Sequence, residues 1–406
     1  MPPAAGMLAG GAGKMDAGMN RPSNEVALEL RIWSEGEFAA SRHAWGDLLR
    51  RSGADPLFMS WDWQWSWWLH HKEALGAQLL LLAAYDGAGT LRALAPVYCH
   101  RRSYFSALPV MRMCLIGQSW RDSSTVFSEY LDFIVDRDVE AQALSALGAW
   151  FQADRSWDEL VFPAVKMTGF LPRLVREQLA NRNLVREVDL VDAYCLTLSP
   201  DFKQFLDQLK PGARRKIYNQ RKKLTGVSRA FATESELPQV FASLNQFRSS
   251  RWESNEESHK QDFHLGFAKR MADDGALKVS TLVHEGRIVS VMYNVRRDGT
   301  EYFLQSGFDT EALPGISVGY IHLGHCIEDA GASGEQRFDF LCGRGKNRNY
   351  KQDFNADRLT LASFHVVRAR SLRLLLAGRR VAARLRALRR KPPAGHSFAV
   401  VAPDVD

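Results

Sequence analysis

The hydrophobic pattern of the first half of the chain predicts strands and one helix in a fixed order. Apolar residues run along 78–85 and 93–102 on either side of a turn at 86–89, which is the pattern of a strand hairpin. The pattern then predicts a strand opening at 128–131, a helix over 140–151 and a strand over 157–162. Strand and helix periods that alternate in this way along a chain are typical of an α/β fold.

The second half repeats this order. A hairpin is predicted over 277–283 and 288–297, and the next strand opens at 300–303. Apolar residues spaced three and four apart then predict a helix over 320–330, and a strand follows over 337–341. We therefore expect two tandem copies of one α/β unit, each with a mixed, mostly antiparallel twisted sheet flanked by helices.

Helical patterns precede both copies. The first copy has five tryptophans between positions 58 and 71. They favour a bulky helix or turn packed half into the core over a strand or an aromatic ligand platform, because some of the rings face inward in any conformation. The second copy is preceded by helical patterns over 202–209, 214–224 and 237–252.

A length of 406 residues suits two domains of ordinary size. Residues 1–24 are rich in Gly, Ala, Met and Pro and lack the regions of a signal peptide, so we expect them to be disordered. We expect a first domain over 25–195 and a second over 196–368, with a basic tail over 369–406. If the protein transfers a group, the first domain is expected to bind the molecule that accepts it and the second the molecule that donates it. The longest apolar run is far shorter than the roughly 20 residues that span a bilayer, so no transmembrane segment is predicted.

Five cysteines lie far apart, and none forms a Cys-x-x-Cys pair. This usage indicates neither a disulfide framework nor a zinc module and fits a reducing cytoplasm. His322, His325 and Cys326 lie close together on one predicted helix, but no third ligand stands at a motif spacing. We interpret these histidines as core or boundary residues and predict no metal.

The net charge of +7 is concentrated near the end of the chain. Ten basic residues and no acidic ones lie between Arg368 and Lys391, so removing them leaves −3 for the rest. A mildly acidic body argues against nucleic acid as a partner. The tail has apolar residues at helical spacing among its arginines, which suits an anionic membrane surface or an acidic partner; a disordered basic tail is the alternative.

A glycine-containing turn before the second copy's helix has the features of a phosphate site. The segment 313–319 contains Pro314, Gly315 and Gly319, and a helix N-terminus after such a turn presents backbone N–H groups to an anion. The corresponding segment of the first copy, 132–140, has no glycine and several acids, which would repel a pyrophosphate. A phosphate-bearing donor is therefore expected in the second copy. An ordinary turn before a helix is the alternative interpretation.

Several short pieces of the chain, taken in order, resemble a known family. They are Pro56-Leu57-Phe58 leading into Trp65 and Trp68, Leu94-Ala95-Pro96, Glu129-Tyr130-Leu131-Asp132, the basic helix Arg214 to Lys223, Ser306-Gly307-Phe308-Asp309, Pro314-Gly315, Phe338-Asp339-Phe340 and Tyr350-Lys351. Together they resemble the two-domain acyltransferases of the GNAT superfamily, in the CelD-like or BioF2-like branch related to FemAB transferases. The resemblance covers roughly residues 55–368.

This resemblance implies a GNAT fold in each half and an acyl-CoA donor held between two splayed strands, near 303–308 and 338–341. It implies an oxyanion site on the first of these strands. The implied donor-binding residues are Ser306, Gly307, Pro314, Gly315, Ile316, Ser317, Val318 and Gly319. Tyr350 is the implied acid for the leaving thiolate, with Lys351 beside it as a second catalytic or phosphate-binding residue. The loop 343–349 is longer and more basic than the family pattern.

The implied acceptor is an amine, either a small molecule or a lipid- or nucleotide-linked sugar. The candidate acceptor-binding residues are Glu129, Asp132, Arg214, Arg215 and Arg221, against the alternatives of surface carboxylates and a solvated basic helix. The expected function is acyl-CoA-dependent N-acyl transfer in polysaccharide or envelope biosynthesis, in the cytoplasm or at the inner membrane face. A FemAB-like transferase that uses aminoacyl-tRNA and a non-catalytic scaffold of envelope-assembly proteins are the alternatives.

Overall fold

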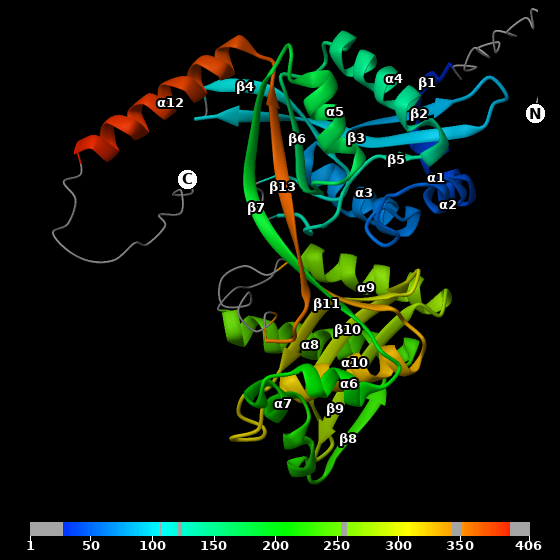
Figure 1. The fold of residues 1–406 in the computed structure, drawn as a ribbon, viewed down its shortest axis with the longest axis vertical. Coiled ribbons are helices and arrows are strands. Elements are labelled where there is room, and N and C mark those ends of the chain that lie inside the picture. Colours follow the sequence, from blue (N-terminus) through cyan, green and yellow to red (C-terminus); the bar gives the residue numbers. More distant parts are fainter. Residues whose placement is uncertain are drawn as a thin grey trace, which may run out of the picture.

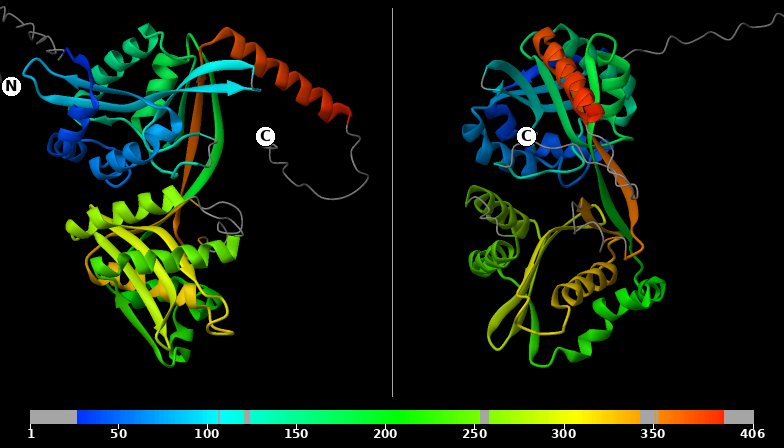
Figure 2. Two further views of the ribbon diagram at one scale, coloured as in Figure 1. Left: turned by 180° about the vertical axis from the view of Figure 1, so that it is seen from behind. Right: turned by 90° about the vertical axis from the view of Figure 1, so that its left-hand side faces the viewer.

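The computed structural model describes residues 27–105, 107–120, 124–252, 258–342, 351 and 353–389 (Figure 1). The N-terminal segment expected to be disordered lies outside this part of the chain. Two halves lie one above the other, and two long strands run through both of them (Figures 1 and 2).

The described part of the first half contains helices and the first six strands of a thirteen-stranded sheet. Its helices are α1 (Glu35–Ala40), α2 (Arg42–Arg51), α3 (Trp61–Leu75), α4 (Glu140–Ala153) and α5 (Phe170–Leu174). Its strands are β1 (Glu29–Trp33), β2 (Gln78–Tyr85), β3 (Leu91–Tyr104), β4 (Leu108–Leu115), β5 (Ile134–Val135) and β6 (Glu159–Lys166).

The second half follows the long strand β7 (Leu184–Thr197). Its helices are α6 (Phe202–Gln208), α7 (Pro211–Ile217), the 3-10 helix η3 (Asn219–Lys223), α8 (Leu237–Trp252), α9 (Ser258–Asp273) and α10 (Val318–Ala332). Its strands are β8 (Val227–Phe231), β9 (Leu277–His284), β10 (Arg287–Arg297), β11 (Thr300–Phe308) and β12 (Arg337–Cys342). The chain returns through β13 (Asp357–Val367) and continues into α12 (Arg370–Arg389).

The strands form one path in the order β1-β2-β3-β4-β6-β13-β7-β12-β11-β10-β9-β8. Its two ends mirror each other, because β4 pairs with β6 in parallel and β11 pairs with β12 in parallel, while the pairings on either side are antiparallel. The last strand of each half is exchanged: β7 follows β6 in the chain but pairs with β12, and β13 follows β12 but pairs with β6. The predicted mixed, mostly antiparallel sheet flanked by helices is confirmed, and the exchange of β7 and β13 joins the two halves into one sheet.

The core is continuous between the halves. Trp63 of α3 contacts Phe263 and Phe267 of α9 edge to face, with ring centroids 5.1 and 4.8 Å apart. Trp63, Trp67 and Trp68 are all almost fully buried, which confirms the prediction of a bulky helix packed into the core. The two halves are therefore held by a packed apolar contact as well as by β7 and β13.

One prediction about strands is corrected. Residues 128–131 form no strand; they lie in an irregular segment before β5, and the counterpart of β11 is β4. Arg112 is the one charged residue inside β4, and it is buried together with Glu159, to which it donates at 2.7 Å. The exchanged strands β7 and β13 were not predicted. The proposed division at 195/196 falls inside β7 and stays a prediction.

Candidate active site

The strands β11 and β12 separate after a short parallel contact. Their pairing consists of Thr300 with Arg337, Glu301 with Phe338 and Tyr302 with Asp339. β11 continues to Phe308 and β12 to Cys342 without further pairing between them. The separation that the resemblance implied for these two strands is thus present. Backbone groups that no longer pair across two separated strands need other hydrogen-bond partners.

A bulge in β11 lies at the point of separation. Tyr293 of β10 pairs with Gln305 and Asn294 pairs with Phe303, so Leu304 has no partner in this ladder. A bulge turns the backbone locally and takes N–H and C=O groups out of the regular ladder. The opening between β11 and β12 therefore begins where the direction of the backbone changes, and this is the place where an oxyanion site was expected.

The turn before α10 differs from the expected open cradle. Pro314 and Gly315 are exposed, and a Cβ on Gly315, whose φ is +74°, would meet nothing within 4 Å. The N–H of Ser317, however, donates to the side-chain oxygen of Gln220 in η3 at 3.0 Å. That bond occupies a backbone group that was expected to be free for a phosphate.

Two glycines in the predicted donor set pack against protein. A Cβ on Gly319 would lie 2.5 Å from the Phe308 ring, and one on Gly307 would lie 2.9 Å from Phe247. Their small size therefore serves packing between α10 and β11 and between β11 and α8, which corrects the prediction that Gly319 lets a ligand approach. Ser306 and Ile316 are half-buried, and Val318 is buried.

A loop of the first half reaches the end of β12. The N–H of Cys342 donates to Glu129 at 2.7 Å, and the Tyr130 hydroxyl donates to Asp339 at 3.0 Å. Asp339 also accepts the N–H of Leu341 at 2.7 Å, and both Tyr130 and Leu341 have positive φ values, 55° and 59°. Non-glycine residues adopt this conformation only where their surroundings fix it.

Lys351 is buried beneath the same strand end. Its Nζ donates to the carbonyls of Phe340, Leu341 and Cys342 at 2.5, 2.9 and 2.8 Å. Burial lowers the pKa of Lys351, and the negative charge of Glu129 acts against that shift. Lys351 therefore holds the end of β12, with all three ammonium protons directed at the protein. Tyr350, its predicted catalytic neighbour, lies outside the described residues.

Glu129 has an unusual environment for a carboxyl group. Burial raises its pKa to about 7, although the nearby Lys351 charge and the Cys342 N–H both favour the ionised form. Asp339, also buried, has a pKa raised to about 6 by the same cause. Two carboxyl groups that titrate near neutrality therefore lie at the end of β12, and such groups are suited to proton transfer at physiological pH.

Two residues of the first half that lie near this point, Asp55 and Lys166, were missed in the sequence. The hydroxyl of Tyr302, the last β11 residue paired with β12, donates to Asp55 at 3.2 Å. Lys166 reaches the same Asp55 oxygen at 3.4 Å and lies 4.5 Å from the centre of the Tyr130 ring. Only an Asp-Pro turn signal at Asp55 was visible in the sequence. These residues bring both halves to the point where β11 and β12 separate.

The other predicted acceptor residues lie elsewhere. Asp132 accepts the N–H groups of Phe170 and Leu171 at 2.7 and 2.8 Å, so it caps α5, which corrects its interpretation as an acceptor ligand. Arg221 pairs with Glu328 at 2.5 Å and Arg214 with Asp207 at 3.0 Å. Arg215, Lys222 and Lys223 are exposed in or beside the same helical segment.

His322 belongs to the core, as predicted. Its two ring nitrogens lie 2.8 Å from the hydroxyls of Ser280 and Ser290. All five cysteines are described and none is in a disulfide. Within the described ranges, no group of three or more His, Cys, Asp or Glu side chains could hold a metal ion, and no helix is long and apolar enough to cross a membrane.

Comparisons with known proteins found one matching family model and several solved structures with a similar fold. Residues 211–352 match the family model described as an acetyltransferase (GNAT) domain. The fold is similar to that of FemX, with a TM-score of 0.60, 10% identity and coverage of 86% of this chain and 99% of that one. It is also similar to a conserved protein of unknown function from Bacteroides thetaiotaomicron VPI-5482, with a TM-score of 0.51, 12% identity and coverage of 84% and 99%. No curated protein sequence matches the chain.

The splayed strands β11 and β12, the helix α10 and Lys351 all lie within the matched segment. The similarity to FemX covers 86% of this chain and therefore includes both halves. Residues 211–352 therefore match an acetyltransferase (GNAT) domain, and the fold of the chain as a whole is similar to that of FemX.

Proposed function

We propose that the protein transfers an acyl group from acyl-CoA to an amine acceptor, with the donor thioester in the opening between β11 and β12. The observation that carries this proposal is the end of strand pairing after Tyr302 and Asp339, together with the bulge at Leu304. A thioester carbonyl placed there can accept a backbone N–H from β11. Such a fixed donor stabilises the negative charge that develops on the carbonyl oxygen.

The acceptor amine then attacks the thioester carbon. A C–N bond forms, the C–S bond breaks, and the amine loses one proton while the leaving thiolate gains one. Glu129 is the proposed base, because its pKa of about 7 leaves a substantial fraction ionised at neutral pH. Tyr350 remains the proposed acid for the thiolate. Lys351 acts through its bonds to the β12 carbonyls and is a positioning residue.

The proposed acceptor is an amino sugar or a related amine in polysaccharide or envelope biosynthesis. The loop that carries Glu129 comes from the first half, so the acceptor would enter from that side. The exposed Arg215, Lys222 and Lys223 could hold the phosphates of a nucleotide- or lipid-linked acceptor. FemAB-like transfer from aminoacyl-tRNA is the second candidate. It is favoured by the hydrogen bond from the Ser317 N–H to Gln220, because this bond occupies a backbone group that would otherwise be free to bind a phosphate of coenzyme A.

Calorimetry with acetyl-CoA separates these donors, and the variant Gly315→Asp tests the site. The carboxylate placed in the open space beside Gly315 should repel the donor phosphates and weaken binding by about tenfold or more. Gly334→Asp is the matched control. Gly334 also has a positive φ, +88°, with nothing within 4 Å of a Cβ, but it follows the opposite end of α10.

Wild-type protein should bind acetyl-CoA or a longer acyl-CoA, and Gly334→Asp should bind it equally. If the wild type binds no acyl-CoA but binds aminoacyl-tRNA, the second candidate replaces the first. Equal weakening by both glycine variants would mean that the phosphates do not lie at the turn before α10.

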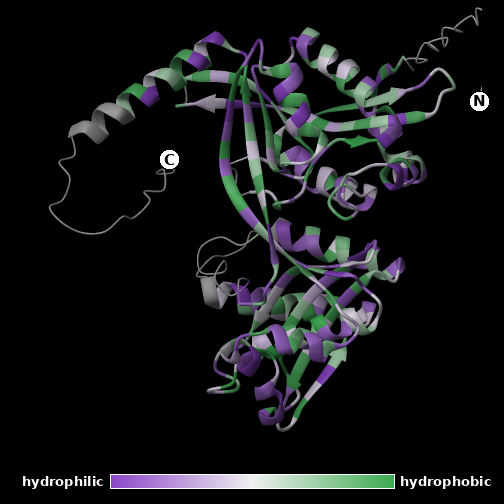
Figure 3. Ribbon diagram, viewed as in Figure 1, coloured by the Kyte–Doolittle hydropathy of each residue, from purple (hydrophilic) through white to green (hydrophobic). Residues whose placement is uncertain are grey.

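We also propose that α12 contacts an anionic membrane surface, at the inner face of the membrane. The helix extends away from the body and mixes hydrophobic with hydrophilic residues (Figures 2 and 3). Leu372 and Leu376 are buried and pack in a cluster with Val367, whereas Leu374 and Val381 are 74% and 57% exposed. A helix with exposed apolar residues among arginines suits the surface of an anionic bilayer.

Sedimentation with phosphatidylglycerol vesicles tests this contact. The double variant Leu374→Ser/Val381→Ser should bind about tenfold less, because it removes apolar area that would enter the bilayer. Ile32→Ser/Leu190→Ser is the control, since Ile32 and Leu190 are similarly exposed, at 56% and 64%, but lie on strands. Unchanged binding of the α12 variant would exclude α12 as the membrane contact.

A further inference from the structure

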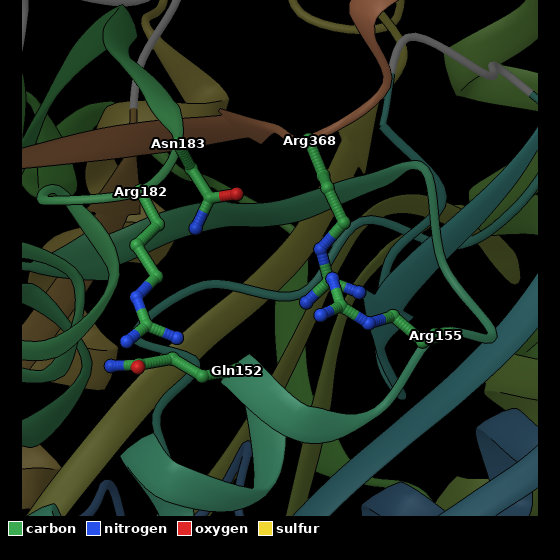
Figure 4. Close-up of a pocket in the computed structure, with 5 residues that line it drawn as sticks. All are labelled: Gln152, Arg155, Arg182, Asn183 and Arg368. Carbon is green, nitrogen blue, oxygen red and sulfur yellow. The ribbon is translucent and has the colours of Figure 1, made fainter.

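A pocket in the first half gathers three arginines away from the candidate active site (Figure 4). Its lining residues are Gln152, Arg155, Arg182, Asn183 and Arg368. They come from four places in the chain: the end of α4, the segment before β6, the segment before β7, and the junction between β13 and α12. Residues so far apart in sequence meet here because β7 and β13 lie side by side.

Arg368 is held rigidly in this pocket. One guanidinium nitrogen donates to the carbonyl of Phe151 at 2.6 Å and another donates to the carbonyl of Asp154. The guanidinium carbon lies 3.5 Å from the centre of the Trp157 ring. A guanidinium fixed by stacking and by helix-end carbonyls loses little further freedom when it binds an anion.

The segment that carries Arg182 is tied to the base of α12. Arg373 donates to the carbonyl of Arg182 at 2.7 Å and to that of Val367 at 2.9 Å. The side chain of Asn183 donates to the carbonyl of Leu179 at 2.9 Å. The walls of the pocket are thus fixed by hydrogen bonds, while Arg155 and Arg182 are exposed.

The pocket has an excess of positive charge. None of its five lining residues is acidic, and Figure 4 shows the Arg155 and Arg368 guanidinium groups facing each other. Burial and then the charge of Arg155 lower the pKa of Arg368, while Asp154 and Asp158 act in the opposite direction. Those two carboxylates already accept hydrogen bonds, Asp154 from the Ser156 hydroxyl at 2.6 Å and Asp158 from the N–H of Met111 at 2.8 Å.

We propose that this three-arginine pocket binds a phosphate group. Guanidinium groups present paired N–H donors that match the oxygens of a phosphate, and a dianion would relieve the repulsion between Arg155 and Arg368. The phosphate can belong to a soluble phosphomonoester or to the headgroup of an anionic lipid beside α12. In either case the ligand links α4, the segment before β7 and the base of α12. The proposal does not depend on acyl transfer.

The test uses the full chain and the double variant Arg155→Ala/Arg182→Ala. Arg368 is left unchanged because its bonds to the end of α4 support the fold. The control is Arg31→Ala/Arg50→Ala, which removes the same charge from two exposed arginines paired with Glu29 and Asp47. Inorganic phosphate and glycerol phosphate are titrated by calorimetry, and phosphatidic acid vesicles are tested by sedimentation.

The pocket variant should lose about tenfold in affinity for at least one of these probes, while the control stays within about twofold of the wild type. Loss for the soluble probes identifies a soluble phosphomonoester, and loss for the vesicles alone identifies a lipid headgroup. If the wild type binds none of the probes, or if pocket and control variants lose affinity equally, the proposal is wrong.

Discussion

Replacing Lys351 by methionine is expected to destabilise the protein by about 3–5 kcal/mol. The Nζ of Lys351 donates to three successive carbonyls at the end of β12, and the residue is 3% exposed. Methionine has a similar length but no donor, so it leaves these carbonyls without that partner in the interior. It also removes the positive charge that favours ionisation of the buried Glu129.

Urea unfolding of four proteins measures this effect and its dependence on Glu129: the wild type, Lys351→Met, Glu129→Gln and the double variant. Part of the cost of Lys351→Met should disappear when Glu129 is already neutral, because a buried carboxylate no longer lacks its counter-charge. Lys222→Met, at an exposed lysine, is the control and should change stability by less than about 0.5 kcal/mol. Additive effects of the two substitutions would show that Lys351 acts only on the carbonyls.

The regular elements around the opening between β11 and β12 could be predicted because their patterns are local. The hairpin β9–β10, the strand β11, the helix α10 and the strand β12 all lie close to their predicted positions. Each shows its own apolar period and a turn signal at its end, such as Glu285-Gly286, where both residues have positive φ values. The fold class followed from the repetition of these local patterns.

The exchange of β7 and β13 could not be predicted in this way. Each strand pairs with a strand of the opposite half, so its partners are fixed by contacts far apart in the chain. The first residues of β7 are half-buried or exposed and include charged positions, which gives no strong apolar period. Tertiary contacts, and not local propensity, place them in the sheet.

The candidate site was predicted only in part, because some of its contacts also join segments that are far apart in the chain. Glu129 was selected from the resemblance, and the structure brings it to Cys342 at the end of β12. Asp55 and Lys166 were missed because their contact with Tyr302 and Tyr130 joins segments with no common motif. Gly319 was misinterpreted, since a glycine required for packing against Phe308 looks the same in a sequence as one that admits a ligand.

Replacing Glu129 by glutamine is expected to lower turnover by about 100-fold or more, the usual contribution of a general base. Glutamine keeps an oxygen that can accept the Cys342 N–H, so the local structure should be retained. The assay follows thiol release with the donor that calorimetry shows to bind and a panel of amine acceptors. Asp309→Asn is the control, because Asp309 caps the turn after β11 through the N–H groups of Glu311 and Ala312, which asparagine can also accept.

The pH profile distinguishes a base from a residue that only supports the fold. Burial raises the pKa of Glu129 to about 7, so the carboxylate that accepts the amine proton forms as pH rises through about 7. Wild-type turnover should therefore rise with pH through this value, and the rise should disappear in Glu129→Gln. In Lys351→Met the loss of the nearby positive charge should move the rise to higher pH. If Glu129→Gln reduces turnover but keeps the wild-type pH profile, Glu129 does not take the proton. Asp339, whose pKa burial raises to about 6, is then the next residue to replace.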